Sequence, residues 1–112
     1  MCLGELSYYL DIVRTQTNYF GVIGDCNANI YGSRFFAELL DFCSESSLIV
    51  SDLHFLGPDT NSYSFVSAAH GTTSWIDHCL CSPGLHSAIN TVLINYNVSL
   101  DDHMPLTVKI SL

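Results

Sequence analysis

The sequence predicts an α/β (α+β) fold, in which two helices alternate with strands in the first half and strands alone fill the second half. Apolar residues near the N-terminus recur at helical spacing, and a second helical pattern follows the first apolar strand. From residue 47 onward the apolar stretches are short and are separated by turn residues. At 112 residues the chain is at most one domain. Its 48% hydrophobic and 12% charged residues exclude a disordered chain.

The first half is expected to hold two helices and two strands. Residues 3–16 and 34–43 carry apolar side chains at helical spacing, and Ser33 is a suitable N-cap for the second helix. Residues 19–24 read as a buried strand that ends at Gly24, and residues 47–52 contain another short apolar run. The Asn- and Gly-rich segment between them is typical of a loop that carries a site.

The second half is expected to be mostly β. The turn residues at 57–59 and 82–84 separate apolar runs, and these runs predict strands at 62–68, 74–80, 91–98 and 105–111. We expect these strands to contribute to one twisted sheet, and two helices are hardly enough to cover both of its faces. The high apolar fraction therefore predicts a surface that needs a partner layer.

The charge and hydropathy of the chain exclude several classes of protein. The formal net charge is −8, and the basic residues are Arg14, Arg34 and Lys109 alone, so the chain offers no basic face for nucleic acid. No stretch approaches the ~18–20 apolar residues of a membrane span. The N-terminus lacks the basic region of a signal peptide. We expect an intracellular protein, nuclear or cytoplasmic, without a membrane partner.

The cysteines and most histidines are expected to be structural. The five cysteines are an odd number whose spacing matches no zinc module, so they are expected to pack as reduced small hydrophobes. Four histidines have no ligand spacing among them and are expected in the core or on the surface: His54, His70, His78 and His86. Trp75 and the Tyr and Phe side chains are expected mostly in the core.

Three short polar motifs interrupt the apolar stretches. They are residues 24–27 (Gly-Asp-Cys-Asn), 74–78 (Ser-Trp-Ile-Asp-His) and 101–106 (Asp-Asp-His-Met-Pro-Leu). Because α/β sheets collect their sites at strand ends, we expect these polar groups to meet at one rim of the sheet. Three carboxylates, one amide and one imidazole can hold a hard divalent cation and orient a water, which is the equipment for metal-assisted hydrolysis of a phosphate ester.

Taken in order, these motifs resemble the endonuclease/exonuclease/phosphatase superfamily. Within it, the chain most resembles the endonuclease domain of LINE-type non-LTR retrotransposons, and the aromatic-hydroxyl-aromatic segment 63–67 adds to that resemblance. The resemblance covers nearly all of this chain but only the C-terminal half of the family's domain. It implies the C-terminal part of a four-layer α/β sandwich with mixed β-sheets, Mg²⁺ (or Mn²⁺) as cofactor, and DNA as the partner of the complete domain.

The resemblance also implies roles for individual residues. Asp25 would hold or polarise the attacking water, and Asn27 would bind the scissile phosphate. Asp102 would help to bind the metal.

The imidazole of His103 would contact a non-bridging phosphate oxygen or donate a proton to the developing charge. Asp77 would bond the other ring nitrogen of His103, because a working imidazole is usually oriented by a carboxylate. This pairing is expected to raise the pKa of His103. Ser64 and Ser74 are candidate hydroxyls for phosphate binding or for support of the other groups.

The chain departs from the family pattern in three respects. The family's N-terminal half supplies a metal-binding Glu that has no counterpart here, Cys26 stands where the family has Phe, and Asp101 stands where it usually has Ser. We therefore expect residues 1–112 to be a truncated Mg²⁺-dependent endonuclease domain that is inactive or nearly so by itself. Two alternatives stay open. One is a non-enzymatic fragment or interaction module, and the other is a phosphoesterase of the same superfamily that acts on lipids or small phosphoesters.

Overall fold

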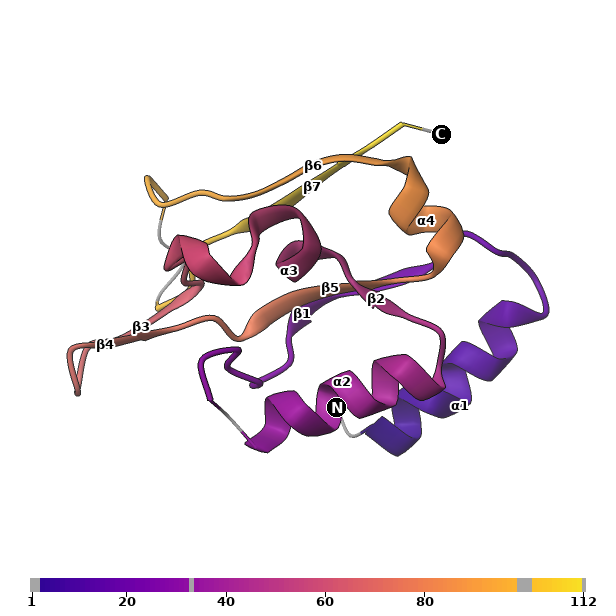
Figure 1. Cartoon of the computed structure of the whole chain (residues 1–112), viewed down its shortest axis with the longest axis horizontal. Coiled ribbons are helices and arrows are strands. Elements are labelled where there is room, and N and C mark those ends of the chain that lie inside the picture. Colours follow the sequence, from indigo (N-terminus) through magenta and orange to yellow (C-terminus); the bar gives the residue numbers. More distant parts are fainter. Residues whose placement is uncertain (1–2, 33, 99–101, 112) are drawn as a thin grey trace.

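The computed structural model describes residues 3–32, 34–98 and 102–111, and it arranges them in layers (Figure 1). Two long helices lie on one side of a three-stranded sheet, and short helices with a β-hairpin lie on the other side. The helices are α1 (Leu3–Arg14), α2 (Arg34–Glu45), α3 (Ser51–Leu56), the 3₁₀ helix η1 (Pro58–Thr60) and α4 (Pro83–Ala88). The strands are β1 (Gly21–Asp25), β2 (Ile49–Val50), β3 (Phe65–Ser67), β4 (Thr72–Ser74), β5 (Asp77–Cys81), β6 (Ile89–Ile94) and β7 (Leu106–Ile110).

The strands form three sheets rather than the one sheet expected from the sequence. The central sheet has the strand order β1-β5-β2, and β3-β4 and β6-β7 are separate two-stranded hairpins. All pairings among the described strands are antiparallel, whereas mixed sheets were expected. The strand predicted at 74–80 is interrupted at Trp75 and Ile76, and the carbonyls of these two residues accept the backbone N–H groups of Ile30 and Cys26. These two carbonyls are hydrogen-bonded to the loop after β1 and not to a neighbouring strand, so β4 and β5 are separate strands.

The core between the long helices and the sheet is apolar. Leu6 and Leu10 lie four residues apart on α1, Leu39 and Cys43 lie four apart on α2, and all four pack with Leu80 of β5. Side chains four residues apart share one helix face, which is why the helical spacing in the sequence predicts this layer. Burial of each leucine contributes about 1.5–3 kcal/mol relative to exposure.

The opposite face of β5 packs on the hairpin β6-β7. Cys79 and Cys81 point to this side, where they form a second cluster with Ile89 and Val92. The four cysteines within the described residues are free thiols, and three of them are buried, as expected; Cys26 is half-buried. Cys2 lies outside the described residues.

Two short helices were missed because they begin at residues that read as strand or turn. The strand predicted at 47–52 ends at Val50, and α3 begins directly afterwards. The turn predicted at 82–84 is the start of α4, where the Ser82 hydroxyl accepts the Leu85 N–H at 3.3 Å and Pro83 takes the first helical position. The strand predicted at 91–98 runs from Ile89 to Ile94. The predicted N-cap Ser33 lies outside the described residues.

Many aromatic side chains are on the surface, which corrects the expectation that they fill the core. Trp75 is fully buried, but others expose between 37% and 64% of their surface: Tyr8, Tyr9, Tyr19, Tyr31, Tyr96, Phe35 and Phe55. The strand β1 is at an edge of the central sheet, and its Ile23 is 54% exposed. These exposed apolar groups fit the expectation that the surface needs a partner layer. None of the described helices is long and apolar enough to cross a bilayer.

Candidate active site

The register of β1 against β5 brings two carboxylates together. Asp25, the last residue of β1, lies opposite Asp77, the first residue of β5. Residues directly opposite each other on antiparallel strands project their side chains from the same face. Two acidic side chains that are 52 positions apart in the sequence therefore lie side by side at one end of the central sheet.

The hairpin β3-β4 holds the third group of the site. Residues 102–104 run alongside β3, with an isolated bridge between Phe65 and His103. The Val66 N–H donates to the Asp102 carbonyl at 2.9 Å, and the Met104 N–H donates to the Ser64 carbonyl at 2.8 Å. These backbone bonds fix His103 at the rim, where its ring also packs edge-on against the Phe65 ring at 5.1 Å.

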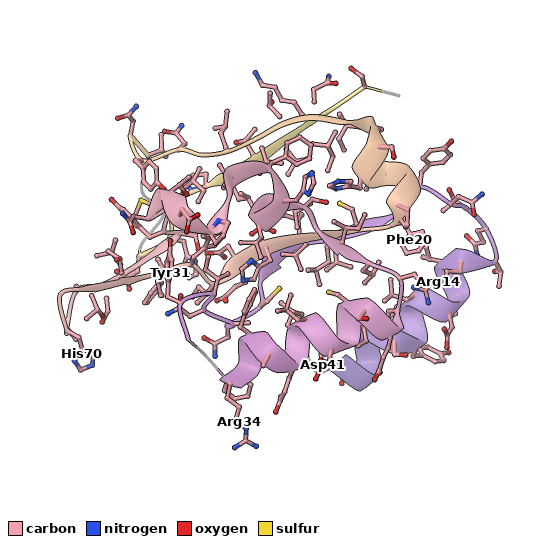
Figure 2. The ribbon with its side chains drawn as sticks, in the orientation of Figure 1. Arg14, Phe20, Tyr31, Arg34, Asp41 and His70 are labelled. Atoms are coloured by element: carbon pink, nitrogen blue, oxygen red, sulfur yellow. The ribbon has the colours of Figure 1, made fainter. Side chains whose placement is uncertain are left out.

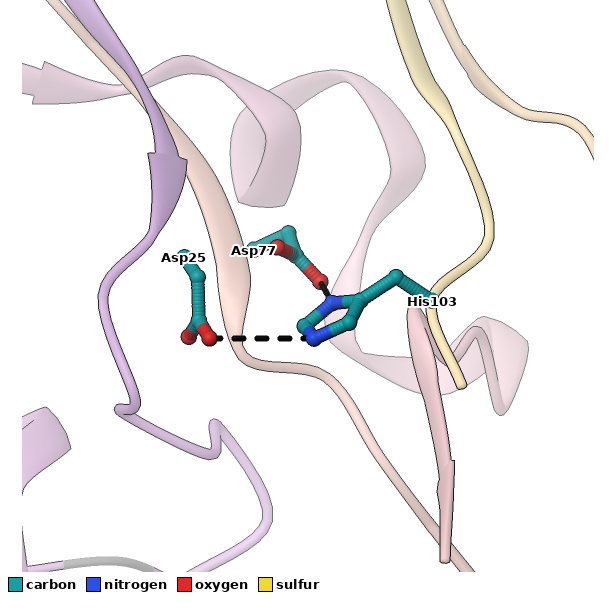
Figure 3. Close-up of side chains that lie close together, drawn as sticks. All are labelled: Asp25, Asp77 and His103. Atoms are coloured by element: carbon teal, nitrogen blue, oxygen red, sulfur yellow. Dashed lines mark hydrogen bonds and ion pairs between the residues drawn. The ribbon is translucent and has the colours of Figure 1, made fainter. Parts of the chain in front are cut away.

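Asp25, Asp77 and His103 form one cluster (Figure 3). The Nδ1 atom of His103 lies 2.9 Å from Asp77 Oδ2, and its Nε2 atom lies 3.7 Å from Asp25 Oδ2. One donor atom from each of the three residues lies within 4.8 Å of the others. The imidazole is thus held by Asp77 and faces Asp25, and the predicted contact between Asp77 and His103 is confirmed.

This geometry raises the pKa of His103 above its ordinary value of 6.5. The largest cause is the hydrogen bond to Asp77; partial burial acts in the opposite direction, and the charges of Asp77, Asp25 and Asp102 add to the rise. His103 therefore carries a proton at neutral pH more often than a histidine in water does. A protonated ring with Nδ1 held by a carboxylate can donate from Nε2 to an anion.

Asn27 follows Asp25 in a tight turn. Its backbone N–H donates to Asp25 Oδ1 at 2.8 Å, and its backbone takes the left-handed φ of 53° that Asn tolerates. Asp25, Cys26 and Asn27 line one side of a cavity of about 540 Å³, and α2 lines the other with Phe35 and Glu38. Burial raises the pKa of the Cys26 thiol to about 11, so this cysteine is not a thiolate nucleophile.

The remaining candidate residues lie around the cluster rather than in it. Asp102 is exposed, and its carboxylate is not among the three donor groups that converge. Ser64 is fully buried, and its hydroxyl accepts the N–H groups of Ile76 and Asp77, each at 3.0 Å. The Ser64 hydroxyl therefore holds the start of β5, which fits the second expected role, support of the other groups. Ser74 is half-buried at the end of β4. Asp101 lies outside the described residues.

A buried polar group that the sequence analysis missed lies behind the cluster. The carboxylate of Asp52 in α3 is fully buried, and it contacts Trp75, His78 and the backbone of Cys79. His78 points to the face opposite Asp77, as expected from strand alternation. Burial lowers the pKa of His78, but the bond to Asp52 and its charge outweigh this, so the net shift is upward. The available signal was a lone carboxylate within the apolar run 48–53.

Arg14 and Arg34 have their contacts with residues outside the cluster. Arg14 at the end of α1 contacts the Ser46 carbonyl and lies over the Phe20 ring at 5.6 Å. Arg34 at the start of α2 points outward into solvent beside Glu38 (Figure 2). The charges that act on His103 are those of the carboxylates Asp77, Asp25 and Asp102. This negative potential favours cations and disfavours phosphate unless a cation is present.

Comparison with solved structures gives the fold. No protein-family model and no curated protein matches the chain. The 3′ phosphatase NExo from Neisseria, bound to a product DNA hairpin, matches with a TM-score of 0.76 at 18% identity over 98% of this chain and 52% of that chain. The NExo 3′-5′ exonuclease from Neisseria meningitidis matches with a TM-score of 0.71 at 18% identity, over the same shares of the two chains.

A retroelement protein matches with the same TM-score as the exonuclease structure. The endonuclease domain of TRAS1, a telomere-specific non-LTR retrotransposon, matches with a TM-score of 0.71 at 17% identity over 96% of this chain and 52% of that one. This chain has an endonuclease/exonuclease/phosphatase-like fold. It spans about half the length of the solved structures that it matches. The expected α/β fold class, as part of a larger fold of this type, is confirmed.

The donor set at the cluster is compatible with Mg²⁺ or Mn²⁺. In proteins Mg²⁺ is usually held by one or two carboxylates, with water and substrate phosphates completing the shell. Asp25 and Asp77 supply two carboxylates within reach of one another, and carboxylates are ligands that suit both Mg²⁺ and Mn²⁺. The residues that are present therefore fit a hard divalent cation in an endonuclease/exonuclease/phosphatase-like fold.

Proposed function

We propose that this chain is the C-terminal portion of a metal-dependent DNA endonuclease domain of the retroelement type, with little or no activity as these 112 residues alone. The observation that carries the proposal is the convergence of Asp25, Asp77 and His103 at the end of the central sheet. The similarity to the TRAS1 endonuclease domain supports the class of reaction.

In the proposed reaction the three clustered residues divide the work. The exposed carboxylate of Asp25 accepts a hydrogen bond from the attacking water and draws its proton away. His103, held by Asp77 through Nδ1, donates from Nε2 to a phosphate oxygen as negative charge develops. Asp77 does not contact the substrate; it fixes the ring orientation and favours the protonated form of the ring.

Asn27 and Asp102 complete the proposed site. Asn27 is exposed at the rim beside Asp25, so that its amide is available to a phosphate oxygen. Asp102 and Asp25 would hold the metal together with groups from the rest of the complete domain. When bound, Mg²⁺ supplies neutralisation of the phosphate charge and a lower pKa for a bound water. The acidic cluster needs that neutralisation, because the chain has a net charge of −8.

The test is a nicking assay on supercoiled plasmid DNA. The chain is fused behind the unmatched half of the TRAS1 endonuclease domain, and nicking is followed with and without Mg²⁺. We expect Mg²⁺-dependent nicking by the fusion, weak or absent nicking by the 112-residue chain, and a loss of at least about 100-fold in Asp25→Ala and His103→Ala.

The matched control is Asp41→Asn, which removes an exposed carboxylate from α2 (Figure 2). Nicking by this variant should equal that of the parent. If Asp25→Ala and His103→Ala also nick at the parent rate, the proposed catalytic roles are wrong.

A second candidate function is phosphatase or exonuclease action at a DNA 3′ end. The observation that favours it is the similarity to NExo, whose structures are those of a 3′ phosphatase and 3′-5′ exonuclease. A hairpin with a 3′ phosphate separates the two candidates. Release of inorganic phosphate without plasmid nicking would favour the second function over the first.

A further inference from the structure

The buried Asp52 side chain ends a chain of hydrogen bonds that leads to the loop of the candidate active site. Its Oδ2 atom accepts the Trp75 indole N–H at 2.9 Å and lies 2.7 Å from His78 Nδ1. Its Oδ1 atom accepts the Cys79 N–H at 2.9 Å. Three bonds to a fully buried carboxylate fix its orientation, and a fixed carboxylate fixes the ring that it contacts.

The other nitrogen of His78 contacts the loop that follows β1. Its Nε2 atom lies 2.6 Å from the Ala28 carbonyl oxygen, and both residues are buried. A carbonyl can only accept, so Nε2 must donate. Rings on either side restrict the imidazole further, since Trp75 stacks on it at 6.4 Å and Phe36 lies at 5.8 Å.

Ala28 lies in the loop that follows Asp25 at the end of β1 and contains Asn27. The ends of this loop are bonded to the segment before β5. The backbone N–H of Cys26 donates to the Ile76 carbonyl at 2.9 Å, and the backbone N–H of Ile30 donates to the Trp75 carbonyl at 3.3 Å. Between these two bonds, Asn27 has its left-handed backbone, and Ala28 is held from inside the protein by His78.

The strand β5 therefore acts on the loop with two neighbouring residues that point to opposite faces. Asp77 faces the cluster, where it lies opposite Asp25 and bonds His103. His78 faces the α2 side, where it bonds the loop two residues beyond Cys26. A shift of the ring would move Ala28, and the turn at Asn27 would move with it.

We propose that Asp52 and His78 are positioning residues for the candidate active site: Asp52 orients the imidazole of His78, whose Nε2–H holds the Ala28 carbonyl and so fixes the Asp25–Asn27 turn beside Asp77 and His103. Neither residue contacts substrate. The consequence for catalysis rests on the proposed function, but the placement of the turn does not.

The test compares two replacements of His78 by amide hydrogen exchange of the 112-residue chain, measured by NMR. The side-chain amide of Asn reaches the place of Nδ1 and can keep the bond to Asp52, whereas the longer Gln reaches the place of Nε2 and can keep the bond to Ala28. We expect the exchange rates of the Cys26 and Ile30 backbone amides to rise about tenfold in His78→Asn. The exchange rates of amides in the β6-β7 hairpin measure the change in overall stability, and this change is first subtracted. In His78→Gln the exchange rates of Cys26 and Ile30 should stay within about threefold of the parent.

The matched control is Ser51→Ala, which removes a buried hydroxyl bonded to His86 at 2.8 Å on the same helix as Asp52. It should speed exchange in the hairpin and in the loop by equal factors. If His78→Asn and His78→Gln also give equal factors in both places, the role of His78 is only stability and the proposal is wrong.

A measurement on the unmodified chain covers the case in which the variants do not fold. The His78 Nε2–H should give a resolved ring N–H signal that is protected from exchange, with a through-bond coupling to the Ala28 carbonyl carbon. A fast-exchanging Nε2–H would overturn the proposal. No DNA is used in these measurements, so a fusion protein that fails to nick plasmid would count against the proposed function and not against this one.

Discussion

The contact between His103 and Asp77 favours the protonated form of the His103 ring. Nδ1 of His103 lies 2.9 Å from Asp77, and this bond is the largest cause of the upward shift in the pKa of His103. Because the folded-state pKa is raised, the stabilisation from this contact is complete below the unfolded-state value of about 6.5 and is lost as the pH rises through the folded-state pKa.

We predict that Asp77→Asn lowers the pKa of His103 towards its ordinary value. The amide removes the carboxylate charge but keeps the size of the side chain. An NMR titration of the His103 ring in parent and variant measures the change, and Asp59→Asn, an exposed change in η1, serves as control. A pKa that stays the same in Asp77→Asn would rule out the pairing as the cause of the shift.

The buried hydroxyl of Ser64 gives a second prediction for a single residue. Ser64→Ala leaves the N–H groups of Ile76 and Asp77 buried without this acceptor. We expect a loss of about 1–3 kcal/mol in the free energy of unfolding, because a buried donor without a partner has the full cost of desolvation.

Urea unfolding followed by circular dichroism measures the effect of Ser64→Ala. The control is Ser44→Ala on the exposed side of α2, which should change stability by less than about 0.5 kcal/mol. If the two variants have the same midpoint, the Ser64 hydroxyl does not hold the start of β5.

Among the elements, α4 depends on close contact with the segment before β1. A Cβ atom on Gly84 would lie 2.7 Å from the backbone oxygen of Asn18, and backbone atoms cannot move aside cheaply. Gly84→Ala should therefore destabilise the protein by about 1–3 kcal/mol, although alanine favours helix more than glycine does. Thermal unfolding measures this, with Ser87→Ala on the same helix as control. An increase in melting temperature would show that the backbone at Gly84 has room for a Cβ atom beside the Asn18 oxygen.

The sequence predicted the long elements and the clustered residues, and it missed what depends on burial. The helix near 34–43 repeats its apolar residues over three turns, so its period is readable, whereas six-residue helices such as α3 and α4 show no period. Asp25, Asp77 and His103 were found through their motifs. Asp52 was missed because only the fold shows that its carboxylate is enclosed by Trp75 and His78.

At the scale of the whole molecule, many large apolar side chains of the described residues are exposed. The strand β1 is an edge strand of the central sheet, and Ile23 on it is 54% exposed. Exposed edges with apolar side chains pair with other chains. The solved structures that match are about twice as long as the matched part, so in the proposed complete domain the extra half would cover this surface.

We predict that the 112-residue chain self-associates and that Ile23→Lys reduces this association, because a lysine on an edge strand opposes pairing. Sedimentation velocity at several concentrations measures the distribution of species. The control is Thr91→Lys, an exposed position on β6 away from this edge. A parent chain that is monomeric at all concentrations, with a cooperative thermal transition, would show that its core is complete without a partner.

The order of strands in the central sheet also affects how the chain folds as it is made. β5 lies between β1 and β2 but follows both in the sequence. A ribosome therefore releases both outer strands before the strand that joins them, and the sheet cannot close until residue 81 has emerged. During that interval the apolar faces of α1 and α2 lack β5, on which they pack in the folded chain, and stay exposed to water. Pairing across more than fifty residues makes closure slow, which lengthens the exposure.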